Sequence, residues 1–111
     1  MSNYRLDLIA EMLEKNPDDT FLNYAAALEH KKNKEIRKAI KIFKKIIQND
    51  PEYLPTYYQL GRLLEATGKT DAAIEVYKEG SVLARKKNDV KAIGELSEAL
   101  LILDVDTGHA W

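Results

Sequence analysis

The chain contains no cysteine, which excludes disulfide bonds, thiolate metal sites and cysteine nucleophiles. Proline and glycine are scarce as well, with three and five residues among 111, so long uninterrupted helices fit between Pro17, Pro51 and Pro55. No apolar run approaches the roughly 20 residues of a membrane-spanning helix. Charged residues also occupy the N-terminal stretch, where a signal peptide would have its apolar core. These absences predict a soluble, cytoplasmic protein that makes no contact with a membrane.

Charge is balanced over the whole chain but uneven along it. With 45% hydrophobic and 32% charged residues, the composition excludes wholesale disorder and predicts a single domain. The formal net charge of −1 gives no overall attraction to nucleic acid or to anionic lipid. Residues 31–45, however, carry eight lysine or arginine side chains against one carboxylate, whereas residues 1–30 carry two basic residues against six acidic ones. The molecule is therefore electrically polar along its sequence.

Apolar residues recur at steps of three and four, which is helical spacing, and no segment alternates like a half-buried strand. Six helices are expected, at about residues 3–15, 19–32, 35–49, 53–67, 70–87 and 89–103. Asp19 lies in a capping cluster at the start of the second helix, and Thr70 is expected to cap the fifth. Gly68 suits a left-handed end to the fourth. The predicted fold is all-α, with residues 104–111 as a loose tail.

The helices repeat at a fixed offset. The spacing from Pro17 to Pro51 recurs between Ala27 and Gly61, Ala39 and Ala73, Ile40 and Ile74, and Phe43 and Tyr77. A constant period of this size indicates stacked helical hairpins. Small residues at one position of the repeat would let two helices approach closely, while the aromatic residues fill the gap between successive hairpins.

These residues resemble the tetratricopeptide repeat, whose signature is Trp-x2-Leu-Gly-x2-Tyr, then Ala-x3-Phe, then Pro. The closer match is Tyr57, Leu60, Gly61 and Leu64, followed by Ala73, Tyr77 and Gly80. One repeat earlier the match is Asn23, Ala26, Ala27 and His30, followed by Ala39, Phe43 and Pro51. The resemblance implies antiparallel hairpins in a short right-handed solenoid, in a small stand-alone protein of a kind frequent in bacteria.

The resemblance also divides the chain. It implies an N-terminal half-repeat at 3–17, repeats at 20–53 and 54–87, a capping helix at 88–103 and the tail at 104–111. Two positions depart from the pattern. Arg85 stands where the second repeat should have proline, so the fifth helix is expected to run on, and Lys34 replaces the turn glycine kept at Gly68. Two repeats are few for such a fold, so the flanking helices are expected to be structurally necessary.

Members of this family hold peptides in a concave groove lined by the first helix of each hairpin. The positions that line it here would be Phe21, Tyr24, Leu28 and Lys31 in one repeat and Pro55, Tyr58, Arg62 and Glu65 in the next. Tyrosine and arginine are favoured in binding hot spots. The resemblance thus implies a scaffold or adaptor for a protein or peptide. The residues with which the family clamps a chaperone tail are absent, so a chaperone co-factor role is disfavoured.

Two other binding modes stay open. The last predicted helix carries a second stripe of small and apolar residues, formed by Val90, Gly94, Ser97 and Leu101 with Ile102 beside it. This stripe could join two copies in a homodimer, although a wide apolar face is also what a terminal helix with two neighbours needs. The basic segment 31–45 could bind an acidic partner or, less readily, nucleic acid. The plainer interpretation of that segment is the solvated face of a helix.

Catalysis has little support. The two histidines are His30, which aligns with a core aromatic position of the repeat, and His109 near the C-terminus. No nucleophile–base pair, glycine-rich phosphate loop or metal-ligand spacing is present. The sequence therefore predicts that the protein is not an enzyme and that it binds no metal, cofactor or small-molecule substrate.

Overall fold

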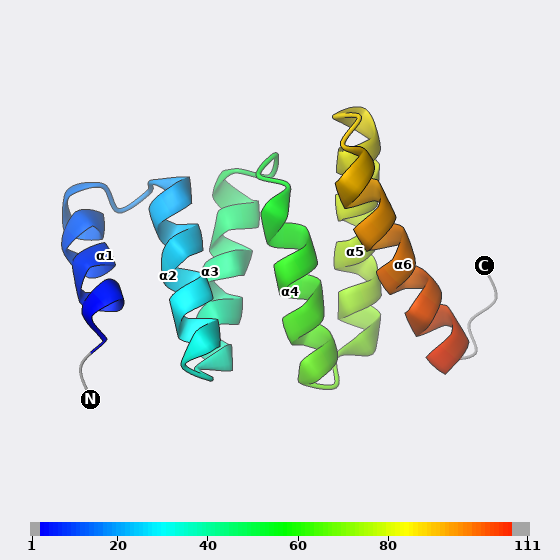
Figure 1. Ribbon diagram of the computed structural model, residues 1–111, viewed down its shortest axis with the longest axis horizontal. Helices are drawn as coiled ribbons and strands as arrows, with labels where there is room; N and C mark the ends of the chain where they lie inside the picture. The colour runs from blue at the N-terminus through cyan, green and yellow to red at the C-terminus, as the bar shows by residue number, and fades with distance from the viewer. Residues whose placement is uncertain (1–2, 108–111) are drawn as a thin grey trace. The chain divides into compact units, whose positions relative to one another are not determined.

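The computed structural model describes residues 3–107, and within that range it contains six α-helices and no strand (Figure 1). The helices are α1 (Tyr4–Lys15), α2 (Thr20–Lys32), α3 (Ile36–Asn49), α4 (Pro55–Ala66), α5 (Thr70–Lys86) and α6 (Val90–Thr107). The all-α class and the six helices predicted from apolar spacing are confirmed. None of these helices, within the described range, is long and apolar enough to cross a membrane.

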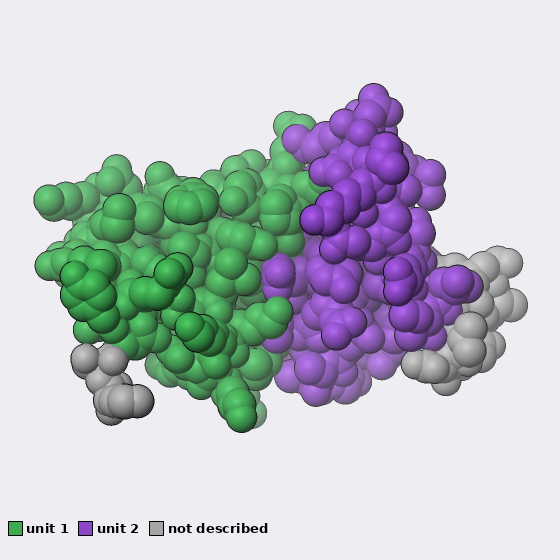
Figure 2. Space-filling model, in the orientation of Figure 1, with its two compact units in different colours: residues 1–56 green, residues 57–111 purple. Residues whose placement is uncertain are grey.

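The chain forms two compact units, residues 1–56 and residues 57–111, which Figure 2 distinguishes by colour. In the first unit, α2 packs against both α1 and α3. In the second, α5 packs against α6, and Gly61 of α4 lies against the ring of Tyr77 in α5. Each unit therefore contains helical hairpins with a core of its own.

The turns after α2, α4 and α5 have the same geometry. Each contains one residue with positive φ, namely Lys34 (63°), Gly68 (78°) and Asn88 (55°). In all three, the N–H of that residue donates to the carbonyl three positions back, and the next N–H donates to the carbonyl five positions back. This is the Schellman pattern, which satisfies the last carbonyls of a helix. As expected, Lys34 occupies the place of the turn glycine, in a conformation that non-glycine residues rarely adopt.

Side-chain caps begin three of the helices. Asp19 accepts a hydrogen bond from the backbone N–H of Leu22 at 2.8 Å, and Asp89 accepts one from Ala92 at 3.0 Å. Asn3 does the same for Leu6 at 3.0 Å, a cap that was not predicted from the sequence. These bonds satisfy backbone donors that have no partner inside the helix.

The prediction that Thr70 caps α5 is wrong. Lys69 occupies the cap position and makes no side-chain capping bond. Its carbonyl accepts the first intrahelical bond, from Ala73, so Thr70 is already inside the helix. The cause is the turn at Gly68, whose hydrogen bonds bring Lys69 directly to the helix entrance.

Two helix ends also differ from the prediction. α4 begins at Pro55 rather than 53, because proline lacks an N–H and suits the first position of a helix. α6 continues to Thr107, so residues 104–107 are helical and do not belong to a tail. No glycine or proline interrupts the chain between Leu103 and Thr107. The remaining predicted tail residues, 108–111, and His109 among them, lie outside the described residues. The expected extension of α5 past Arg85 is confirmed.

The repeat positions form the core as predicted. Phe43 and Tyr77, which are one period apart, are both fully buried, and Ile9, one period before Phe43, is buried as well. Ala27 in the first unit is also fully buried. Gly61 is its counterpart in the second unit, and a β-carbon added there would overlap Cε1 of Tyr77. The small residue on one helix and the aromatic residue on the next are thus in closest contact.

Candidate binding surface

In the first unit, the predicted groove residues Phe21, Tyr24, Leu28 and Lys31 form one stripe along α2. Phe21 is 67% exposed, which is unusual for a phenylalanine in a domain with a formed core. Tyr24 is half-buried, because its ring packs on Phe43 and Tyr53 with ring centroids 5.8 and 5.3 Å away. Leu28 and Lys31 are half-buried too. Phe21 is therefore the apolar side chain that this stripe offers most fully to a partner.

In the second unit, Tyr58, Arg62 and Glu65 form the corresponding stripe along α4. Arg62 is exposed, and Tyr58 packs its ring against Tyr77 with centroids 6.2 Å apart. The phenol of Tyr77 donates a hydrogen bond to the Glu65 carboxylate. Burial, together with this bond, raises the pKa of Tyr77 far above its ordinary value of 10.0, so the phenol stays a donor. Glu65 thus holds an internal partner, and Arg62 is the accessible charge of this stripe.

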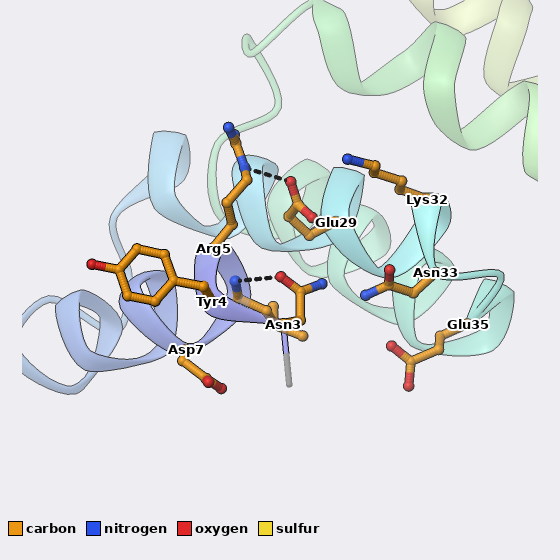
Figure 3. Close-up of a pocket in the computed structure, with 9 residues that line it drawn as sticks. Asn3, Tyr4, Arg5, Asp7, Glu29, Lys32, Asn33 and Glu35 are labelled. Carbon is orange, nitrogen blue, oxygen red and sulfur yellow. Dashed lines mark hydrogen bonds and ion pairs between the residues drawn. The ribbon is translucent and has the colours of Figure 1, made fainter. Parts of the chain in front are cut away.

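A polar hollow of about 650 Å³, with no predicted groove residue among its lining, lies between the start of α1 and the end of α2 (Figure 3). In it, Nε of Arg5 pairs with the nearly buried carboxylate of Glu29 at 2.7 Å. Tyr4, Asp7 and Lys32 also line it, so charges of both signs are present. This hollow was not predicted from the sequence. One feature of the sequence could have revealed it. Arg5 lies at the repeat position that Ala39 and Ala73 occupy in the later helices, so a long charged side chain replaces a small one there.

A second hollow, of about 610 Å³, lies between α2 and α3 and is called the lysine hollow below. It is lined by Asn23, His30, Lys38, Lys41, Ile42, Lys44, Lys45 and Gln48. At its edge, Glu35 pairs with Nδ1 of His30 at 3.0 Å and with Nζ of Lys38 at 3.1 Å. The hydrogen bond with His30, followed by that with Lys38, lowers the pKa of Glu35. Four of the eight basic residues of segment 31–45 thus line a concave surface, which the charge pattern alone did not predict.

The second stripe of α6 faces outward. Val90, Leu101 and Ile102 are 80%, 61% and 49% exposed, and a β-carbon on Gly94 would meet no atom within 4 Å. Ser97 is half-buried. The other stripe of the same helix faces inward, with Leu96, Ala99 and Leu103 buried. α6 therefore carries apolar side chains on two faces, and one of them is open to solvent in the single chain.

Helical hairpins, a constant sequence period and a small residue packed on an aromatic ring define a helical-repeat protein. The tetratricopeptide repeat family model matches residues 30–94, which is more than half of the chain. The chain belongs to the tetratricopeptide repeat family.

Solved structures agree with this assignment. The crystal structure of a tetratricopeptide repeat domain protein from Salinibacter ruber is 38% identical, with a TM-score of 0.75, and the match covers 78% of this chain and 96% of that one. A solution structure of the Salinibacter domain is 37% identical, with a TM-score of 0.79, and covers 86% and 96%. A protein from Bordetella parapertussis shares the fold at 20% identity, with a TM-score of 0.82 over 96% and 91%. Among curated proteins, none matches the chain.

Proposed function

We propose that this protein is a non-catalytic scaffold, which binds a peptide or protein segment through the stripes on α2 and α4. The observation that carries the proposal is the 67% exposure of Phe21 on the stripe where the family pattern places the groove. An exposed aromatic ring beside half-buried tyrosines offers large contact area at a modest entropy cost. Arg62 supplies a cation that can pair with a carboxylate of the bound segment. No cofactor or metal is needed for such binding.

We also propose that the protein acts in the cytoplasm of a bacterium. The absence of cysteine from the sequence is compatible with a reducing compartment. The relatives from Salinibacter ruber and Bordetella parapertussis support a bacterial source.

The groove is tested by affinity capture from the native cell lysate with wild type and with the double variant Phe21→Ala, Arg62→Ala. The exposed positions make both substitutions mild for stability, while the variant should retain less than about a tenth of each groove-bound protein. The matched control is Val82→Ala, Arg85→Ala, which removes an exposed apolar residue and an arginine from α5. Quantitative mass spectrometry compares the three captures. The groove assignment is wrong if the two variants lose the same proteins or if neither loses any.

A second candidate function is self-association through α6, and the exposure of Val90, Leu101 and Ile102 favours it. We expect light scattering after size exclusion to give a dimer mass for wild type and a monomer mass for Leu101→Glu, because a buried unpaired carboxylate would oppose the contact. Val82→Glu is the control, since Val82 is 68% exposed on α5. A wild-type protein that stays monomeric at high concentration would rule out this function.

A further inference from the structure

We propose that the lysine hollow between α2 and α3 is a separate binding site, which takes an acidic, partly apolar peptide segment of a partner protein. The site consists of Lys38, Lys41, Lys44 and Lys45 around Ile42, with His30 at its α2 side. This proposal goes beyond the groove function, since Asn23 and His30 lie roughly 140° around α2 from the stripe that begins at Phe21. The two surfaces can therefore be occupied independently.

Three of the four lysines in the lysine hollow, Lys41, Lys44 and Lys45, are not neutralised by an acidic residue of its described lining. None of the described residues that line it is acidic. The carboxylate nearest in sequence to these lysines, Glu35, is already engaged by His30 and Lys38. Lys41, Lys44 and Lys45 are exposed, and the described part of the chain contains no ion pair to any of them. Several like charges around one concave surface attract an anionic ligand more strongly than the same charges scattered over a convex one.

The repeat itself shows that the fold does not require these lysines. One period later, Lys38, Lys41 and Lys45 correspond to Ala72, Glu75 and Glu79, and among the four only Lys44 has a lysine counterpart, Lys78. The equivalent helix α5 forms with those residues. Structural need therefore explains the apolar side of α3 but not the lysines on its outer side. The positive charge is a property of this hollow rather than of the repeat.

The composition of the hollow favours a peptide over a nucleic acid. Among the described residues that line it there is no phenylalanine, tyrosine or tryptophan to stack a base, and no arginine to grip a phosphate with two parallel hydrogen bonds. Its one ring, that of His30, is already paired with Glu35. Ile42 and the methylene stems of the lysines instead give it an apolar floor under a cationic rim. A segment that alternates carboxylates with one apolar side chain matches both parts. An acidic protein segment is thus the occupant that the site fits.

The test uses a fluorescein-labelled peptide of repeated Asp-Glu-Leu-Glu as the probe and fluorescence anisotropy as the readout. Wild type is compared with Lys41→Glu, Lys45→Glu, which copies the residues of the second repeat at these positions and so preserves the helix. The control variant Lys69→Glu, Lys91→Glu changes the net charge by the same amount at two exposed positions of the second unit, neither of which lines the hollow. Circular dichroism confirms that both variants are folded.

We expect the hollow variant to bind the probe at least about tenfold more weakly than wild type, whereas the control variant should stay within about twofold. Binding should weaken as salt increases, and amide shifts should concentrate on residues 38–48 rather than on 72–82. An equal loss of affinity in both variants would show that binding depends only on net charge, and it would overturn the proposal. It would also be overturned if the peptide failed to bind, or if an oligothymidylate or phosphatidylglycerol vesicles bound in its place.

Discussion

Replacement of Phe43 by alanine should lower the free energy of unfolding by about 3–5 kcal/mol, as for other large aromatic residues removed from a core. The ring is fully buried, and it also supports Tyr24 of α2. Because a small domain is stable by only about 5–15 kcal/mol, this loss should remove a large part of the protein's stability. Urea unfolding followed by circular dichroism measures the loss.

The chain offers a matched control for this substitution, since it has one other phenylalanine. Phe21→Ala makes the same chemical change at a side chain that is 67% exposed, so its effect should stay within about 0.5 kcal/mol. The expected difference between the two variants is thus several kcal/mol for the same atoms removed. Similar losses at Phe43 and Phe21 would contradict the burial on which the first unit is built.

Replacement of Gly61 by alanine should also destabilise the protein, by about 2 kcal/mol net. The added β-carbon would overlap Cε1 of Tyr77 and lie 2.6 Å from its Cδ1 and Cζ. The ring cannot easily retreat, because it is fully buried and its hydroxyl is bound to Glu65. Overpacking of this kind costs about 1–3 kcal/mol or more, which outweighs the gain of up to about 1 kcal/mol from the higher helix propensity of alanine.

Two further variants separate the clash from the effect of propensity. Gly94→Ala adds the same methyl group in α6, where the added β-carbon would meet no atom of any other described part of the chain within 4 Å, and it should stabilise the protein by about 0.5–1 kcal/mol. Gly61→Ala with Tyr77→Phe recreates the Ala27 and Phe43 pair of the first unit and releases the ring from Glu65. This double variant should recover part of the lost stability in urea unfolding. If Gly61→Ala proves as stable as Gly94→Ala, the close contact with Tyr77 does not exist.

The repeat period in the sequence predicted which residues are buried in the core. Phe43, Tyr77 and Ile9 are buried because the repeat offset returns each of them to the same place in a hairpin. The cap at Asp19 followed from equally local chemistry, since a short side chain can reach a free backbone donor only at a helix start. The end of α6 was harder to predict. Neither a capping residue nor a helix breaker marks position 103, so amphipathic spacing alone could not locate it.

The candidate surfaces were less predictable, because they depend on contacts between helices. The charge of residues 31–45 was visible in the sequence, but the concavity of the lysine hollow arises only where α3 packs on α2. In the same way, Tyr24 and Glu65 were predicted as groove residues without a sign that Phe43, Tyr53 and Tyr77 would engage them. Side chains committed to internal partners look the same in a sequence as side chains open to a ligand.

The three left-handed turns have a consequence for grafting further repeats onto this protein. Lys34 and Gly68 are separated by one full period, but Asn88 follows Gly68 well before a second period is complete. The chain thus uses its within-hairpin turn a third time, between α5 and α6, and the repeat positions of any added hairpin would be out of phase with those of the first two repeats. A consensus repeat joined after α6 would meet a helix whose small and large positions fall at the wrong offsets. The productive junction for such a graft lies instead before Arg85, where the repeat frame is still intact.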